Sequence, residues 1–174
     1  DDSFYRLLAQ NIDQPPERCA LLESCRFTVP SKEDLDRVIR DAYAEAARGM
    51  LDGGADAFLI ETCQDILQSK AAVLGCQQGM AAAGRRLPLI SHVNIETTGT
   101  MLLGSEIGAA LTALEPLGID MIGMNCATGP EEMNEHLRYL SQNTTLPVSV
   151  MPNAGLPVLG ANGAEYPLQA PELG

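Results

Sequence analysis

The clearest pattern in the chain is a run of apolar residues at helical spacing that begins after Pro30. Ser31 is a suitable N-cap, and the acidic Asp34 follows three residues later, as at many helix starts. Apolar side chains then recur every three or four residues, at Leu35, Val38, Ile39, Ala42, Ala46 and Met50. Gly53 and Gly54 end the pattern, so the sequence predicts a helix over residues 31–52.

After this helix, short apolar runs alternate with longer helical stretches. The apolar runs are the predicted strands, at 57–62, 89–95, 121–126 and 147–152. The helical stretches between them lie at 66–81, 105–117 and from 131 onward. The strands start roughly 30 residues apart, a spacing typical of βα units, which predicts a parallel sheet.

Two architectures accept this pattern: an open, doubly wound sheet and an eight-stranded barrel of about 250 residues. No G-x-G-x-x-G string follows any predicted strand, so the signature of a dinucleotide-binding fold is missing. The pattern therefore favours an α/β fold of the (β/α)8 TIM-type barrel, incomplete, with about four βα units present. Residues 1–30 show no clear period and stay unassigned, which leaves 31–174 as the partial barrel domain.

Length and charge narrow the function classes. The 174 residues suffice for one domain, and 11 basic against 23 acidic residues give a net charge of −12. Such a chain repels nucleic acid and anionic membranes, so neither is an expected partner. No apolar run is long enough for a membrane span and no signal peptide is evident, so a cytoplasmic protein is expected. Five widely spread cysteines predict reduced thiols rather than a disulfide framework.

In both architectures, chemistry belongs at the carboxyl ends of the strands. The residues at these ends with reactive or hydrogen-bonding side chains are Glu61, Thr62, Cys63, Asn94, Glu96, Asn125, Cys126 and Asn153.

Cys126 and Glu61 are the strongest candidates among them. Cys126 precedes a turn into a helix N-terminus, a setting that favours a thiolate for metal binding or nucleophilic work. An unreactive buried thiol fits the same position. Glu61 ends an apolar run, where a carboxylate is partly desolvated; it either binds a substrate ammonium group or accepts hydrogen bonds from the barrel rim. Cys63 is expected on the same side as Glu61, as a bystander.

The histidines and the remaining cysteines are weaker candidates. His92 lies inside a predicted strand and is expected to be a core histidine with its hydrogen bonds satisfied, whereas His136 lies toward solvent. Neither histidine has a partner at metal-ligand spacing. Cys19 and Cys25 lack the C-x-x-C spacing, so they are not expected to bind zinc.

Three strings, in this order and at barrel-unit spacing, carry a resemblance to a known family: GADAFLIET at 54–62, GMNCATGP at 123–130 and MPNAGLP at 151–157. Together they resemble the homocysteine S-methyltransferase family, and most closely the domain found in cobalamin-dependent methionine synthases. The resemblance extends from about Asp41 to about Leu168.

This resemblance implies a zinc-dependent transfer of a methyl group to the homocysteine thiol, giving methionine, on a (β/α)8 barrel. It implies that Cys126 is one of three thiolates that bind zinc and that Glu61 meets the amino-acid end of homocysteine. Asn125 and Asn153 match motif positions that shape the substrate site. The methyl group would come from methylcobalamin on a separate module and ultimately from methyltetrahydrofolate, so the cobalamin and folate modules of a parent chain are implied partners.

The chain departs from the family in one respect. The other two zinc ligands are a pair of adjacent cysteines in a Gly-Gly-Cys-Cys string, and this chain has no such pair, since Cys126 is its last cysteine. It is therefore expected to be a middle part of the domain, inactive alone, because one thiolate does not hold zinc. A betaine- or S-methylmethionine-dependent homocysteine methyltransferase, a noncatalytic barrel and a phosphate-binding α/β protein are the alternatives. The last lacks a phosphate loop, since the loop at 97–100 has no lysine.

Overall fold

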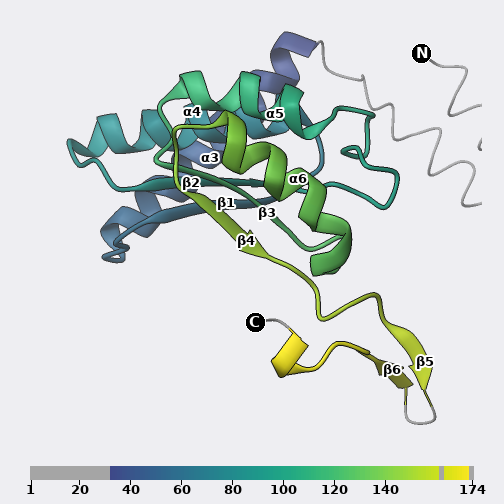
Figure 1. Ribbon diagram of the computed structural model, residues 1–174. Coiled ribbons are helices and arrows are strands. Elements are labelled where there is room, and N and C mark those ends of the chain that lie inside the picture. The colour runs from purple at the N-terminus through teal and green to yellow at the C-terminus, as the bar shows by residue number, and fades with distance from the viewer. Residues whose placement is uncertain (1–31, 161–162, 173–174) are drawn as a thin grey trace, which may run out of the picture. The chain divides into compact units, whose positions relative to one another are not determined.

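The computed structural model describes residues 32–160 and 163–172 (Figure 1). Most of these residues belong to a compact unit that spans residues 36–174. The elements follow in the order α3 (Lys32–Asp52), β1 (Phe58–Cys63), α4 (Ile66–Ala83), β2 (Leu89–Val93), α5 (Ile107–Leu114), η1 (Glu115–Leu117), β3 (Met121–Asn125), α6 (Pro130–Asn143), β4 (Val148–Met151), β5 (Val158–Gly160), β6 (Gly163–Glu165) and η2 (Ala170–Glu172).

Strands β1 to β4 form one parallel sheet in their sequence order, β1-β2-β3-β4. A helix connects each strand to the next, so the predicted βα units and α/β fold are confirmed. The strand order runs in one direction without reversing, as in a barrel, whereas a doubly wound sheet reverses at its switch point. All four carboxyl ends consequently lie at the same edge of the sheet.

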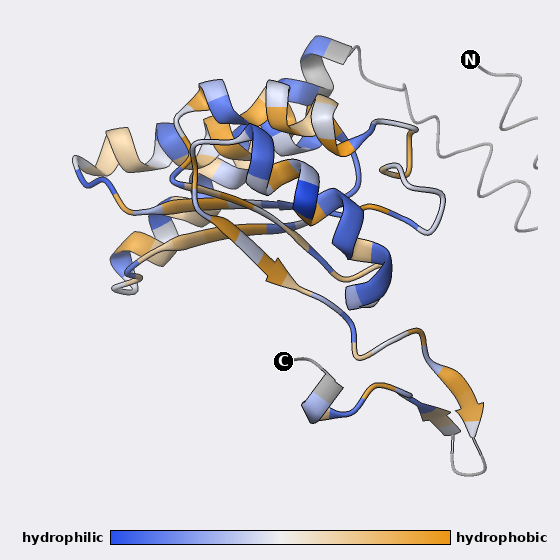
Figure 2. Cartoon of the chain, viewed as in Figure 1, coloured by the Kyte–Doolittle hydropathy of each residue, from blue (hydrophilic) through white to orange (hydrophobic). Residues whose placement is uncertain are grey.

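The hydrophobic core lies between one face of this sheet and the helices. Alternate strand residues point into it, and Figure 2 shows apolar residues along the strands, whereas α6 carries many hydrophilic ones. The buried strand residues on this helix-packed face include Phe58, Ile60, Leu89, Val93, Ile122 and Met124. Apart from Phe58 the described core is built from non-aromatic side chains, in keeping with an aromatic content of 4%.

Helices α3 and α4 approach closely because α4 carries two glycines at their contact. A Cβ atom at Gly79 would lie 2.7 Å from the backbone oxygen of Ala44 and 2.9 Å from Cβ of Ala47. Gly75 is equally crowded, against the backbone of Arg40. These two glycines therefore let α4 pack directly against the backbone of α3.

The opposite face of the sheet, called the inner face here, carries the other alternate strand residues. Leu59 and Met151 on this face are 42% and 47% exposed, although both are large and apolar. Beyond β4, strands β5 and β6 form a short antiparallel hairpin that the sequence patterns did not predict. Within the described ranges, no helix has the length and apolar character that crossing a membrane requires.

Candidate functional site

A bulge at the end of β1 places Glu61 and Cys63 on opposite faces of the sheet. Ile60 pairs with Ser91 and Cys63 with Val93, so β1 holds one more residue than β2 over this stretch. Thr62 takes up the extra residue with a φ of 58°. Cys63 therefore points into the core with 0% exposure, and the prediction that it shares a side with Glu61 is wrong. Glu61 is exposed on the inner face, where a desolvated carboxylate was expected.

Asn125 connects the ends of β1 and β3. Its side-chain oxygen accepts a hydrogen bond from the Thr62 backbone N–H at 2.9 Å. Its Nδ2 donates to Thr62 Oγ1 at 2.8 Å and to the Glu61 carboxylate at 3.4 Å. The same Nδ2 lies 3.2 Å from the sulfur of Cys126, to which it also donates. One buried amide thus joins three of the residues expected at this edge.

The backbone at this site is strained. Outside the masked residues, the non-glycine residues with positive φ are Thr62 at 58°, Cys126 at 52° and Ala127 at 59°. Left-handed backbone is costly for such residues, and it persists at sites where function needs a particular side-chain direction. All three lie where β1 and β3 end, next to the Asn125 amide. The strain is therefore concentrated at the candidate site.

Cys126 is held by its own backbone and remains partly exposed. Its N–H donates to the Met151 carbonyl at 3.0 Å, which extends the pairing of β3 with β4. Its carbonyl accepts from the Thr128 N–H at 2.6 Å, which closes the tight turn. The helix that follows is capped by Glu132, whose carboxylate accepts from the Gly129 N–H at 3.0 Å.

Asn153 lies two residues after the end of β4 and bonds to the same turn through its backbone. Its N–H donates to the Thr128 carbonyl at 3.1 Å, so it lies beside the turn that carries Cys126. The structure thus brings Glu61, Asn125 and Cys126 into direct hydrogen-bonded contact, with Asn153 next to them. Thr62, which sequence reasoning named only as a strand-end residue, is the hydrogen-bonding partner that completes this arrangement.

A row of residues crosses the inner face next to this site. Glu61 follows Ile60, whose partner is Ser91, so Glu61 lies beside His92. His92 in turn pairs with Gly123. A Cβ atom at Gly123 would lie 2.7 Å from His92 Nε2, so this glycine makes room for the imidazole ring. Burial lowers the pKa of His92, and the nearby Glu61 carboxylate acts in the opposite direction.

His92 is buried as predicted, but its hydrogen bonds are not satisfied. Neither ring nitrogen has a hydrogen-bond partner among the described residues, although the side chain is 0% exposed. The expectation of a satisfied core histidine is wrong in this respect. Asn94 Oδ1, at the end of the same strand, is likewise buried and without a partner in the described ranges.

The cysteines differ in environment. Burial raises the pKa of Cys63, and raises that of Cys76 to about 11, so both are neutral thiols at pH 7. Cys63, Cys76 and Cys126 are all free thiols. No three potential ligands among the described histidines, cysteines and acidic residues are grouped to hold a metal ion, so Cys126 supplies one ligand at most. Cys19 and Cys25 lie outside the described residues.

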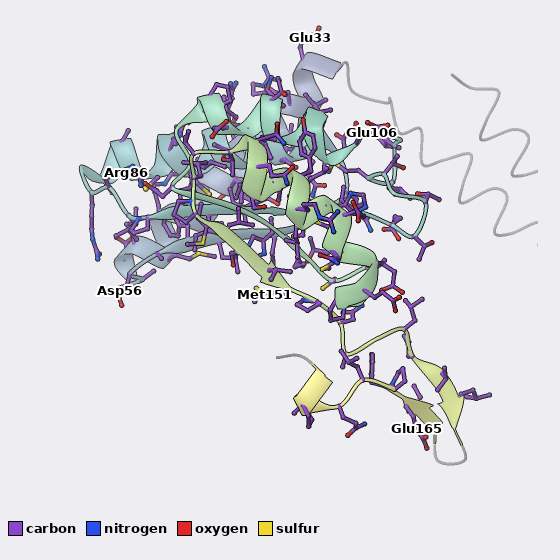
Figure 3. The ribbon with its side chains drawn as sticks, viewed as in Figure 1. Glu33, Asp56, Arg86, Glu106, Met151 and Glu165 are labelled. Carbon is purple, nitrogen blue, oxygen red and sulfur yellow. The ribbon has the colours of Figure 1, made fainter. Side chains whose placement is uncertain are left out.

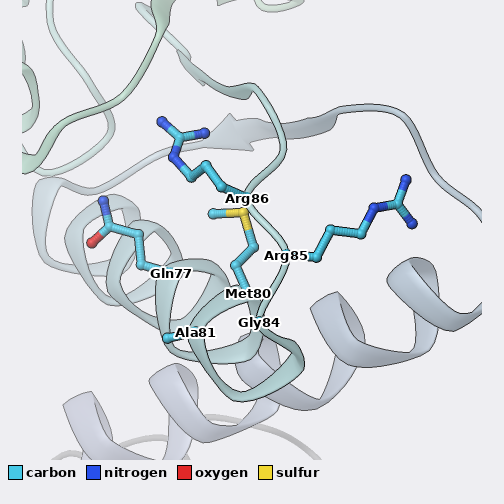
Figure 4. Close-up of a pocket in the computed structure, with 6 residues that line it drawn as sticks. All are labelled: Gln77, Met80, Ala81, Gly84, Arg85 and Arg86. Carbon is cyan, nitrogen blue, oxygen red and sulfur yellow. The ribbon is translucent and has the colours of Figure 1, made fainter.

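A hollow of about 270 Å³ near the end of α4 lies away from this site. It is lined by Met80, Arg85 and Arg86 among others (Figure 4). Figure 3 shows Arg86 and Asp56 near the amino ends of the strands, whereas Glu106 lies at the opposite end. Because Arg86 pairs with Asp120 at 2.8 Å and Arg85 bonds to backbone carbonyls, the cations that line this hollow are already engaged.

Comparison with known sequences gives consistent matches. The family model described as homocysteine S-methyltransferase matches residues 22–174. The methionine synthase of Mycobacterium tuberculosis (strain ATCC 25618 / H37Rv) is 75% identical over 136 residues, which cover 78% of this chain and 11% of that protein. The methionine synthase of Mycobacterium leprae (strain TN) is 74% identical over 137 residues, which cover 79% of this chain and 11% of that protein. The chain thus spans about a tenth of the length of these relatives.

Solved structures show the same fold. The apo form of the homocysteine methyltransferase MmuM from Escherichia coli superposes with a TM-score of 0.57 at 20% identity, covering 68% of this chain and 43% of that chain. Its metallated form gives a TM-score of 0.50 at 23% identity, and the match covers 64% of this chain and 40% of that chain. The described parallel sheet and its helices therefore correspond to part of a larger α/β fold in these structures.

Proposed function

Because the chain belongs to the homocysteine S-methyltransferase family, we propose that residues 31–174 are part of the homocysteine-binding barrel of a methionine synthase. The observation that carries this proposal is the Asn125 amide, which bonds to Glu61 and Cys126 at the carboxyl edge of the sheet. A carboxylate and a thiol at one edge match a substrate with an ammonium group and a sulfur atom. The 75% identity to a methionine synthase supports the same assignment.

In this proposal, Cys126 is one of the thiolate ligands of a zinc ion. Its partial exposure and its N–H donor from Asn125 suit a sulfur that carries negative charge. The residues described here do not make a zinc site by themselves, so the remaining ligands would come from elsewhere in the parent protein. Coordination to zinc deprotonates a thiol at neutral pH, which is the chemistry the metal would supply to homocysteine.

Glu61 would bind the ammonium group of homocysteine. Its carboxylate is exposed on the inner face, and Asn125 donates one hydrogen bond to it, which leaves further acceptor positions for a ligand. Asn125 would hold Glu61 and Cys126 at a fixed separation, and Asn153 would shape the rim beside them. The substrate would thus be held at its amino-acid end and at its sulfur.

The methyl donor in this proposal is methylcobalamin on another module of the parent chain, recharged from methyltetrahydrofolate. The support for it is the name of the relatives, methionine synthase, and their much greater length. Betaine- or S-methylmethionine-dependent enzymes share the homocysteine site, but the high identity to methionine synthases favours the first donor.

Titration calorimetry with L-homocysteine on the full-length protein that carries this chain tests the role of Glu61. Glu61→Gln removes the negative charge and should weaken binding about tenfold or more, because hydrogen bonds to charged groups contribute about 1.5–3 kcal/mol. Glu96→Gln is the matched control, since Glu96 lies in the loop after β2 at the same edge, and its binding should stay unchanged. Equal effects of the two changes, or no binding by the unaltered protein, would contradict the proposal.

A further inference from the structure

Two polar side chains on the inner face, one in β2 and one directly after it, are buried without hydrogen-bond partners among the residues that the structure describes. Asn94 is 4% exposed and its Oδ1 has no partner within the described ranges. His92 is 0% exposed, and both of its ring nitrogens are likewise unpartnered there. Neither side chain is used by the site as proposed above. Buried polar atoms normally find partners, because an unpaired one destabilises the folded protein.

The positions of these side chains place them around Glu61 and Asn125. Val93 and Ile95 point into the core, so the alternation of the strand directs Asn94 to the inner face. Val93 pairs with Met124, so Asn94 lies beside Asn125. Ile60 pairs with Ser91, so the next residues, Glu61 and His92, are also neighbours. His92 is two residues before Asn94 and therefore lies on the same face.

Two of these three unpartnered atoms can accept a hydrogen bond. Asn94 Oδ1 only accepts, and a neutral imidazole has one nitrogen with a lone pair. Burial lowers the pKa of His92, which keeps the ring neutral and this lone pair available. Together with the Glu61 carboxylate they provide three acceptors, one anionic, on one face and on adjoining strands. A primary ammonium group has three N–H donors and one positive charge.

We propose that Asn94 and His92 complete, around Glu61, a subsite for the ammonium group of an amino-acid substrate. This inference rests on the proposed function and makes Asn94 and His92 specificity-determining residues for it. The bound ammonium donates to the Glu61 carboxylate, to Asn94 Oδ1 and to one nitrogen of His92. Ligands that lack the primary amine leave two buried acceptors unpaired, so the site discriminates against them.

The test compares two ligands on the full-length protein: L-homocysteine, and 4-mercaptobutanoic acid, which has the same thiol and carboxylate but no amine. Asn94→Leu replaces the amide with an apolar group of similar shape. It should weaken homocysteine binding about tenfold or more and change binding of 4-mercaptobutanoic acid less than about twofold. Asn94→Asp, which keeps an acceptor oxygen, should retain homocysteine binding. Titration calorimetry measures the affinity of each of these proteins for each ligand.

Ser91→Ala is the matched control. Ser91 Oγ is also buried and without a partner among the described residues, but Ser91 pairs with Ile60 on the helix-packed face. Its substitution should leave both affinities unchanged. Thermal melting provides a second readout: removal of an unpaired acceptor should leave the Tm of Asn94→Leu equal to or above that of the unaltered protein.

The outcomes distinguish failure of the ammonium subsite from failure of the proposed function. Equal weakening of both ligands, a lowered Tm, or unchanged homocysteine binding in Asn94→Leu would overturn the ammonium subsite while leaving the proposed function standing. If Asn94→Leu does not fold, His92→Phe applies the same ligand comparison, because it keeps a ring over Gly123 and removes the acceptor. Absence of homocysteine binding in the unaltered protein would overturn the proposed function, and this inference with it.

Discussion

Replacement of Asn125 by alanine removes the side chain that joins β1 to the turn after β3. The substitution eliminates the hydrogen bonds to the Thr62 N–H at 2.9 Å, to Thr62 Oγ1 at 2.8 Å and to the Cys126 sulfur at 3.2 Å. It also opens a cavity, because Asn125 is 1% exposed. Both effects act on a stretch of backbone that already has positive φ at Thr62 and Cys126.

The size of the effect follows from these contacts. Loss of the partner of a part-buried backbone N–H costs about 1–3 kcal/mol. The Thr62 hydroxyl and the Cys126 sulfur are partly accessible to water, so their bonds contribute about 0.5 kcal/mol each. We therefore expect the free energy of unfolding to fall by about 2–4 kcal/mol. Homocysteine affinity should fall as well, because Glu61 and Cys126 both lose the hydrogen bond that the Asn125 amide donates to them.

Urea denaturation of the whole homocysteine S-methyltransferase domain measures this loss, with Asn134→Ala as the control. Asn134 is an exposed asparagine on α6, so its substitution should change the free energy of unfolding by less than about 0.5 kcal/mol. A loss below about 1 kcal/mol for Asn125→Ala, or a loss equal to that of the control, would refute the reasoning. It would show that the Asn125 bonds do not hold the edge of the sheet together.

Two further predictions concern thiol reactivity and pH. Cys126 should react with iodoacetamide before Cys63 and Cys76, since burial raises the pKa of both core thiols; peptide mass spectrometry that finds Cys63 modified first would contradict this. Burial lowers the pKa of His92 below its unfolded value of 6.5. The contribution of the neutral His92 ring to stability is therefore complete above pH 6.5. It is lost as the pH falls, because the unfolded chain takes up a proton on this ring more readily than the folded protein does. The urea midpoint should therefore fall more between about pH 7.5 and about pH 5.5 in the unaltered protein than in His92→Phe. An equal fall in the two proteins would count against a buried neutral ring.

The sequence patterns predicted the alternating strands and helices correctly because apolar runs and helical spacing are both local features of the chain. Short apolar runs placed β1 to β4, and apolar residues at helical spacing placed α3 to α6, within a few residues. The hairpin of β5 and β6 was missed, since its strands have three residues each and are too short to show a period. The strand order, which supports a barrel, is a tertiary property and became evident only in the structure.

The meeting of Glu61, Asn125 and Cys126 was predictable, because parallel strands align their carboxyl ends at one edge. The bulge at Thr62 was not, since positive φ is unusual for a β-branched residue and nothing local in the sequence indicates it. This bulge reverses the direction of Cys63. The unpaired nitrogens of His92 also depend on neighbouring strands, so the sequence indicated burial and not the missing partners.

The proposed zinc and homocysteine site is tested most directly by zinc analysis and homocysteine titration of the full-length protein beside its Cys126→Ser variant. The proposal predicts about one zinc ion per chain in the unaltered protein, with both zinc and homocysteine binding lost in the variant. Zinc content that the substitution leaves unchanged, or zinc absent from both proteins, would contradict it. Cys126 would then be an ordinary free thiol at the end of β3.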